Sequence, residues 1–332
     1  MSELRVVRDD LRPPESRAPR RHLLSIRDLT RDDVERLLGT AASFEASLER
    51  ELKKLPTLRG RTVVNLFYES STRTQSSFEL AAKRLSADTM TIKAAGSSVD
   101  KGESLKDTAL TLSAYDPDVI VIRHPQIGAP GLVAEVTDAH VVNAGDGKHQ
   151  HPTQALLDLY TIKNELGRLE GVHVAIVGDV LHSRVARSNV QALVLMGARV
   201  TLVGPPALLP RGIEALGCET TTDIGALAGA DIVYVLRMQR ERMQEGANYV
   251  PSLREYAARW GVTPARLRPG QKVMHPGPMN RGVEIDGAVA DAADALVTRQ
   301  VRSGLVVRMA VLYDLLTQGP APVPAEARVG VA

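Results

Sequence analysis

The chain has 332 residues, of which 44% are hydrophobic, and its 41 lysines and arginines nearly balance 39 aspartates and glutamates. This length favours two domains, and the net charge of +2 gives no basic surface of the kind that binds nucleic acid. Cys218 is the only cysteine, which excludes an intramolecular disulfide and a cysteine zinc cluster and fits a reducing cytoplasm.

The two ends of the chain have the composition of flexible tails. Residues 1–19 mix charges and prolines without apolar periodicity, and residues 318–332 are rich in proline and alanine. The N-terminal segment lacks the apolar core of a signal peptide, and no run elsewhere is long and apolar enough to span a bilayer. We therefore expect a cytoplasmic protein that binds neither membrane nor nucleic acid.

Between the tails, the first half of the chain alternates strand patterns with helix patterns. Thr30 and Asp33 have the spacing of a capping box, and apolar residues follow them at helical spacing, which predicts a helix. Another apolar stripe at helical spacing begins at Phe78. Short β-branched runs predict strands with helices between them, at residues 61–68, 89–93, 118–123 and 140–145.

The second half repeats this alternation. It contains strand patterns at residues 173–179, 199–204, 231–237 and 271–277, and a periodic stretch at 302–316 predicts a closing helix. Alternating strands and helices predict parallel sheets, so two such series predict an α/β protein of two domains with a cleft between them. Ligands of such sheets bind beyond the carboxyl ends of the strands, and the loops there carry most of the notable polar residues.

One strand-ending turn has the composition of an anion site. The stretch ESSTRTQSSFE, residues 69–79, follows a predicted strand and precedes a helix that begins at about Thr72. A helix N-terminus favours an anion, and Ser71, Thr72 and Thr74 add hydroxyl donors. Arg73 adds a fork of two donors. From this motif alone, a serine or threonine cap beside a surface arginine fits equally well.

Other strand-ending loops carry the same kinds of residue. The loop SSVDKGES holds Ser97 and Lys101, although a solvated loop also explains it. His151 and Gln154 stand at the start of a helix, although His151 also fits a capping or core histidine. The remaining polar residues at strand ends are Arg123, Arg184, Arg237 and Gln239, together with the loop HPGPMNRG that contains Gly277 and Pro278.

Taken together, these motifs resemble the transcarbamoylase family, and within it the catalytic chains that use L-aspartate. Family members carry S-T-R-T, S-x-x-x-K-G-E, R-H-P, H-P-T-Q, G-D-x-x-x-x-R, R-x-Q and H-P-x-P segments, and this sequence has all of them in that order, over about residues 22–317. The resemblance implies two Rossmann-like domains, each a mostly parallel sheet flanked by helices, with the active site in the interdomain cleft. Residues 20–151 would bind carbamoyl phosphate and residues 152–301 aspartate, with a C-terminal helix at about 302–317 packing back on the first domain.

The resemblance also implies an activity. A carbamoyl group would pass from carbamoyl phosphate to the amino group of L-aspartate, releasing phosphate and N-carbamoyl-L-aspartate for pyrimidine biosynthesis. Negative charge then grows on the carbonyl oxygen, so donors aimed at that oxygen would stabilise the transition state. By resemblance the catalytic residues are Arg73, Thr74, Arg123 and His151, with His151 a hydrogen-bond donor. No metal and no cofactor are implied.

The same resemblance assigns the substrate contacts. Arg184 would hold the α-carboxylate of aspartate, and Arg237 with Gln239 the β-carboxylate, in a bidentate geometry that lysine cannot copy. Ser97 and Lys101 of a neighbouring subunit would reach carbamoyl phosphate, and Lys101 also aspartate. A homotrimer is then the minimal active unit, and a regulatory chain or a dihydroorotase partner is left open. Within one chain, the residues that would bind carbamoyl phosphate are Ser71, Thr72, Arg73, Thr74, Arg123, His151, Gln154, Gly277 and Pro278.

Two other functions stay open at this point. An ornithine or other amino-acid carbamoyltransferase would share several motifs, but ornithine enzymes usually carry H-C-L-P where this chain has His275 and Pro276. Arg237 would also repel the cationic side chain of ornithine. A non-catalytic phosphate binder with a Rossmann-like sheet would lack some reacting-site residues, and none is missing. Two departures from the family pattern are Gly277, where many relatives carry leucine, and Gln75, where arginine is common.

Overall fold

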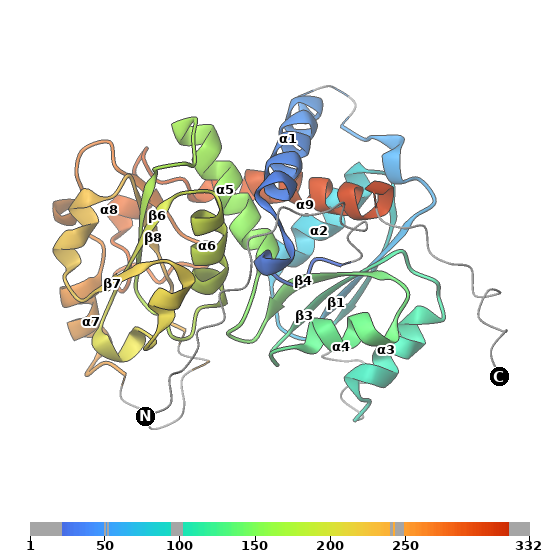
Figure 1. Cartoon of the computed structure of the whole chain (residues 1–332), viewed down its shortest axis with the longest axis horizontal. Helices are drawn as coiled ribbons and strands as arrows, with labels where there is room; N and C mark the ends of the chain where they lie inside the picture. Colours follow the sequence, from blue (N-terminus) through green and yellow to red (C-terminus); the bar gives the residue numbers. More distant parts are fainter. Residues whose placement is uncertain are drawn as a thin grey trace, which may run out of the picture.

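The computed structural model describes residues 22–49, 51, 53–93, 102–239, 242 and 249–318 (Figure 1). The predicted N-terminal tail, and the predicted C-terminal tail apart from Gln318, lie outside these residues. The predicted site residues Ser97 and Lys101 also lie outside them. No helix in the described part of the chain is long and apolar enough to cross a membrane.

The first domain is built on a four-stranded parallel sheet in the order β2-β1-β3-β4. These are the four strands that the sequence predicts for the first half of the chain. The two central strands, β1 and β3, consist mainly of buried valine, leucine and isoleucine, as expected for a sheet covered on both faces. The strands are β1 (Thr62–Phe67), β2 (Asp88–Lys93), β3 (Val119–His124) and β4 (His140–Asp146).

The second domain holds a five-stranded parallel sheet in the order β7-β6-β5-β8-β9. Four of its strands are predicted from the sequence. The edge strand β7 is not, because its three residues are polar, partly exposed and without apolar alternation. The strands are β5 (His173–Val177), β6 (Arg199–Val203), β7 (Glu219–Thr221), β8 (Ile232–Val235) and β9 (Lys272–Met274).

Helices cover the sheets, which confirms the predicted α/β class with two domains. In Figure 1, α3 and α4 lie below the first sheet, and α1, α2 and α9 lie above it. The helices are α1 (Arg31–Leu48), α2 (Thr72–Arg84), α3 (Leu105–Ser113), α4 (Ala129–Val136), α5 (Pro152–Leu166), α6 (Arg184–Leu195), α7 (Leu253–Trp260), α8 (Gly287–Ala290) and α9 (Val297–Gln318).

The ends of two helices test the sequence patterns directly. α1 begins at the predicted capping box: Asp33 N donates to Thr30 Oγ1 at 3.2 Å, and Thr30 N donates to Asp33 Oδ2 at 2.9 Å. The closing helix α9 begins at Val297, earlier than the periodic stretch that starts at residue 302. Its first turn therefore lies against the second domain, where Leu296 N donates a hydrogen bond to Val273 O of β9.

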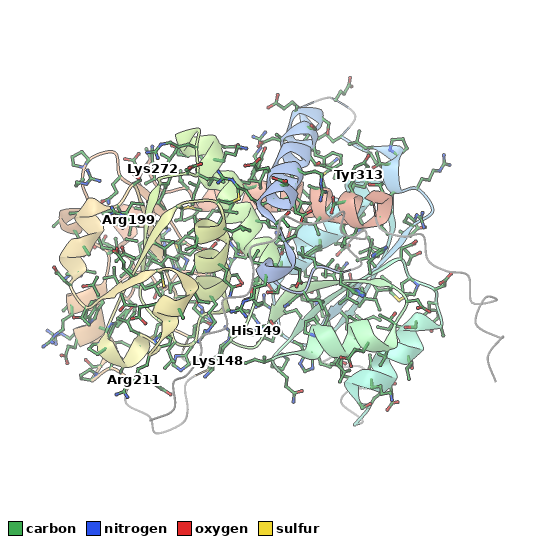
Figure 2. All side chains as sticks on the ribbon, viewed as in Figure 1. Lys148, His149, Arg199, Arg211, Lys272 and Tyr313 are labelled. Atoms are coloured by element: carbon green, nitrogen blue, oxygen red, sulfur yellow. The ribbon has the colours of Figure 1, made fainter. Side chains whose placement is uncertain are left out.

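α5 and α9 join the two domains. α9 packs along α5 and also on α1 and α2. Tyr313 of α9 lies edge-on to Phe44 of α1, with ring centroids 5.6 Å apart, and Lys272 of β9 pairs with Glu165 of α5 at 2.9 Å. Figure 2 labels Tyr313 in the first domain and Lys272 in the second. One continuous apolar core includes residues of both sheets and of both helices. The carboxyl ends of the two sheets are therefore held around one cleft.

Candidate active site

A cavity of about 630 Å³ lies at the carboxyl ends of strands from both sheets. Its walls come from the end of β3, from the segments that follow β1, β5, β8 and β9, from the N-terminal turns of α2 and α5, and from α9. Every predicted site residue in the described part of the chain lines this cavity. These residues are Ser71, Thr72, Arg73, Thr74, Arg123, His151, Gln154, Arg184, Arg237, Gln239, Gly277 and Pro278.

Two helix N-termini open into the cavity. Ser71 is the N-cap residue of α2 and His151 that of α5, and neither side chain makes a cap hydrogen bond. The interpretation of these two residues as ordinary capping side chains therefore does not hold. The partial positive charge of both helix ends faces the cavity, which suits an anion such as phosphate.

Six arginines line the cavity, and Glu69 is the one carboxylate among its described lining residues. Glu69 Oε2 accepts hydrogen bonds from Arg184 Nη2 at 2.6 Å and from Arg123 Nε at 3.2 Å. Arg242 Nη2 lies 3.8 Å from Glu69 Oε1. Burial acts to raise the pKa of Glu69, but these arginines outweigh burial, and the pKa is lowered overall. The site keeps an excess of positive charge that suits a ligand with several negative charges.

Burial and neighbouring cations also change the basicity of two predicted catalytic residues. Burial, followed by the charge of Arg184, lowers the pKa of Arg123 to about 9. His151 is fully enclosed, and burial followed by the charges of Arg123 and Arg184 lowers its pKa well below 6.5. Its Nδ1 is buried without a hydrogen-bond partner. His151 is therefore a neutral imidazole at pH 7, which has one N–H to donate.

Arg73 lies against the loop that follows β9. A Cβ atom on Gly277, whose φ is +63°, would lie 2.7 Å from Arg73 Cζ, so a larger residue here would require the Arg73 guanidinium to shift and would adopt a backbone conformation that favours glycine. His275 stabilises this loop, because its Nδ1 accepts a hydrogen bond from Gly277 N at 2.8 Å. Burial, followed by the charge of Arg237, lowers the pKa of Arg73. The predicted phosphate-binding and aspartate-binding arginines therefore lie near one another.

The segment after β8 is fixed by a buried carboxylate from the end of β5. Gln239 N donates to Asp179 Oδ2 at 3.1 Å, and Asp179 is fully buried. Arg237 Nη2 donates to Gln239 Oε1 at 3.3 Å. Arg237 and Gln239, which the sequence resemblance pairs on one substrate carboxylate, therefore touch each other in the cavity wall.

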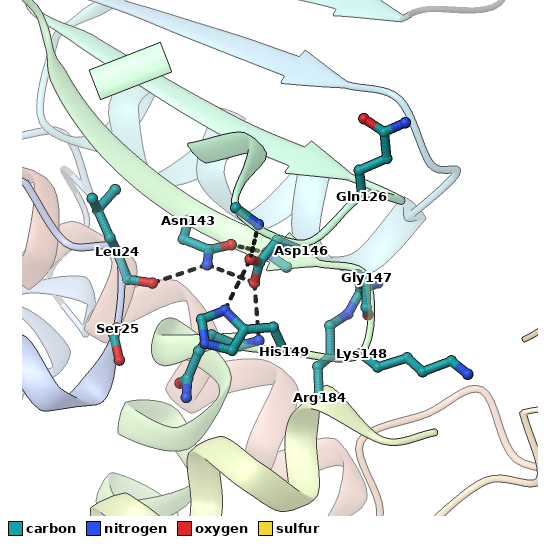
Figure 3. Close-up of polar contacts among 12 residues, drawn as sticks. Leu24, Ser25, Gln126, Asn143, Asp146, Gly147, Lys148, His149 and Arg184 are labelled. Carbon is teal, nitrogen blue, oxygen red and sulfur yellow. Dashed lines mark hydrogen bonds and ion pairs between the residues drawn. The ribbon is translucent and has the colours of Figure 1, made fainter. Parts of the chain in front are cut away.

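The turn between β4 and α5 is organised by Asp146, whose carboxylate lies at the centre of Figure 3. Arg184 Nη1 donates to Gly147 O in this turn at 3.3 Å. The turn thus positions His151, which follows it, and holds Arg184 from the second domain. The donors around the Asp146 carboxylate are Asn143 Nδ2 at 2.9 Å, Gln150 N at 2.9 Å, Gly128 N at 3.0 Å and His149 Nδ1 at 3.0 Å.

The structure adds three charged residues that the sequence reasoning does not assign. Glu69 stands at the start of the anion-binding motif, and Arg242 lies just beyond the R-x-Q segment. Arg308 is a buried arginine of α9, with its guanidinium carbon 5.1 Å from the centre of the Phe78 ring. Its position inside the apolar run of residues 305–312 is the sequence signal that could have identified Arg308.

Comparisons with known proteins agree with one another. Residues 21–164 match the sequence model of the aspartate/ornithine carbamoyltransferase carbamoyl-P binding domain, and residues 170–315 match that of the Asp/Orn binding domain. The chain is 58% identical over 320 residues to the aspartate carbamoyltransferase catalytic subunit of Acidothermus cellulolyticus, covering 93% of this chain and 98% of that protein.

Two solved structures are similar in fold. Aspartate transcarbamoylase from Trypanosoma cruzi in complex with aspartate and phosphate is 33% identical with a TM-score of 0.83, covering 92% of this chain and 99% of that one. The catalytic subunit of M. Jannaschii aspartate transcarbamoylase is 37% identical with a TM-score of 0.79, covering 90% of this chain and 98% of that one.

Proposed function

This chain belongs to the aspartate/ornithine carbamoyltransferase family, and we propose that its cleft transfers the carbamoyl group of carbamoyl phosphate to L-aspartate. One observation carries this proposal. Two uncapped helix N-termini, Arg73 and Arg123 meet Arg184 and Arg237 in the same cavity. Such a cavity suits a phosphate at one end and two carboxylates at the other.

The residues divide between the leaving group and the carbonyl. Ser71, Thr72, Arg73 and the N-terminus of α2 bind the phosphate. When the carbamoyl C–O bond breaks, the phosphate takes up the proton that the amine loses and leaves as the dianion HPO4²⁻. Thr74, Arg123 and the neutral imidazole of His151 donate to the carbonyl oxygen, where charge develops when the amine attacks. His151 takes up no proton in this step and acts only as an electrophilic hydrogen-bond donor. The protein mainly aligns the two substrates, an effect that contributes about 7 to 11 kcal/mol in well-oriented reactions.

The acceptor substrate is held from the second domain. Arg184 takes the α-carboxylate of aspartate, and Arg237 with Gln239 takes the β-carboxylate. We assign carbamoyl phosphate to the first domain, residues 20–151, and aspartate to the second, residues 152–301. Gln154 and the backbone of Gly277 and Pro278 accept hydrogen bonds from the carbamoyl NH2 group.

The proposed site is completed by a second copy of the chain. Ser97 and Lys101 of a neighbouring subunit reach the phosphate, which gives a homotrimer as the minimal active unit. A heterologous contact that closes a ring of three is an allowed symmetry for such sharing. This part of the proposal rests on the sequence motif S-x-x-x-K-G-E alone.

The direct test is phosphate release from carbamoyl phosphate, with L-aspartate and L-ornithine as separate acceptors and the product identified by mass. We expect turnover with aspartate alone, because the excess of arginine in the cavity repels the cationic side chain of ornithine. Turnover with ornithine would contradict the roles of Arg237 and Gln239. No turnover with either acceptor would favour a phosphate-binding protein without catalytic activity.

A further inference from the structure

A buried carboxylate directly behind the cavity accepts four side-chain hydrogen bonds. Asp158 of α5 is 1% exposed and does not line the cavity. Its partners come from four different helices and strands. They are Gln154 Nε2 at 3.1 Å and Gln300 Nε2 at 2.7 Å on Oδ1, and Asn189 Nδ2 at 2.9 Å and the Tyr234 hydroxyl at 2.7 Å on Oδ2.

This carboxylate determines which end of each amide points away from it. An ionised carboxylate only accepts hydrogen bonds, so Gln154 and Gln300 must both turn their NH2 groups toward Asp158. The Oε1 atom of Gln154, which lines the cavity, is then the end presented to a ligand. The Oε1 atom of Gln300 accepts from His275 N at 3.0 Å, which fixes the start of the loop that carries Gly277 and Pro278.

We propose that Asp158 is a positioning residue that makes the site selective for a carbamoyl group over other acyl groups. It does so by aligning two sets of acceptors, the Gln154 oxygen and the carbonyls of the 275–278 loop, toward one NH2 group. The proposal rests on the proposed function, because it concerns how the same site recognises carbamoyl phosphate. Without Asp158, either glutamine amide is free to turn its NH2 group outward, where it would face the NH2 group of the substrate.

The charge on Asp158 is supported by its surroundings. Burial raises its pKa to about 6, while the hydrogen bonds from Asn189, Gln300, Tyr234 and Gln154 act to lower it. The carboxylate is therefore ionised at neutral pH. The neighbouring Arg308 is a charged partner on α9: burial lowers its pKa to about 10, and the charge of Asp158 opposes that shift.

Acetyl phosphate is the probe for this selectivity, because a methyl group replaces the NH2 group and the rest of the molecule is kept. The measured quantity is the ratio of the inhibition constant of acetyl phosphate to the KM of carbamoyl phosphate. In Asp158→Leu we expect this ratio to fall by about 10- to 100-fold, through a rise in the KM of carbamoyl phosphate, since the oriented acceptors are lost. The inhibition constant of acetyl phosphate should stay nearly unchanged.

Asp158→Asn is the conservative variant, and it should keep most of the selectivity. Its Oδ1 can still accept from Gln154 and Gln300. Its Nδ2 would face the NH2 group of Asn189, and when that amide turns over, Nδ2 can donate to Asn189 Oδ1, which is buried without a partner. Tyr234→Phe is the matched control, since it removes a donor from the Oδ2 side, which orients no group toward the cavity. It should lower stability and leave the ratio unchanged.

If Asp158→Leu weakens the binding of carbamoyl phosphate and of acetyl phosphate equally, the proposal is overturned, because Asp158 would then have a purely structural role. Should Asp158→Leu fail to fold, Gln300→Met takes its place and should lower the ratio where Tyr234→Phe does not. An unchanged ratio in Gln300→Met would then overturn the proposal. Wild-type protein that fails to carbamoylate aspartate would instead refute the proposed function, so the two failures are distinguishable.

Discussion

Replacing Glu69 by glutamine removes the negative charge from between three arginines while keeping the shape of the side chain. The Glu69 side chain is 22% exposed, and its closest partner, Arg184 Nη2, lies 2.6 Å away. A hydrogen bond to a charged group contributes about 1.5 to 3 kcal/mol, and breaking a fully buried pair costs about 3 to 5 kcal/mol. For this partly exposed group we expect a loss of about 2 to 3 kcal/mol in the free energy of unfolding.

Thermal unfolding measures this loss. An unfolding entropy of about 2.1 cal/mol/K per residue gives about 0.7 kcal/mol/K for the chain, so Tm should fall by about 3 to 4 °C. Phosphate together with succinate, a dicarboxylate that lacks the amine, should reduce the difference in Tm between wild type and Glu69→Gln, because the ligands supply the missing negative charge. Glu170→Gln is the control: Glu170 is 73% exposed and pairs with Arg31 at 2.8 Å, so its loss should leave Tm unchanged.

Two results would refute the reasoning about Glu69. An unchanged Tm in Glu69→Gln would show that the arginines do not depend on this carboxylate. A difference in Tm that increases when phosphate and succinate are added would show that Glu69 helps to bind the ligands. It would contradict the role of Glu69 as the negative charge that neutralises the arginines when no ligand is bound. Either result would require a different account of how the empty site tolerates its excess of positive charge.

Four further changes test the proposed roles. Arg73→Ala should lower kcat/KM by about 100-fold or more through loss of a donor at the developing charge, and near-normal phosphate release would contradict this. Arg237→Ala should raise the KM of aspartate while calorimetry still detects carbamoyl phosphate binding; loss of that binding would refute the division between domains. Because the pKa of His151 is well below 6.5, kcat should show no ionisation of His151 between pH 6.5 and 8.5, and a step that disappears in His151→Asn would show otherwise. Mixed trimers of Lys101→Ala and Arg73→Ala chains should regain activity if sites are shared, whereas no recovery would place each site within one chain.

The fold could be predicted from the sequence wherever a local pattern determines the structure. The capping box at Thr30 and the apolar strands are local patterns, and the structure contains them. The strand β7 is missed because its pairing with β6 depends on the neighbouring sheet and not on its own three residues. The early start of α9 at Val297 likewise depends on contacts with the second domain.

Some residues of the candidate site could likewise be identified from local sequence patterns, and others could not. Residues in recognisable motifs could be chosen from the sequence, and those in the described part of the chain lie around one cavity. The roles of Glu69 and Asp158 could not, because each depends on partners that are distant along the chain, such as Arg184 and Gln300. An acidic residue inside an apolar run, such as Asp158 in α5, indicates burial with a partner, but it does not identify that partner.

The course of α9 has a consequence for synthesis on the ribosome. Helices α1 and α2 and the first sheet leave the ribosome early, but α9, which packs on α1 and α2, follows the second sheet in the sequence. One helical layer of the first domain is therefore incomplete until residues 297–318 have been made. Contacts between residues this distant along the chain slow folding, and the first domain exposes apolar surface until α9 has packed on it. We expect chains cut short before residue 297 to aggregate.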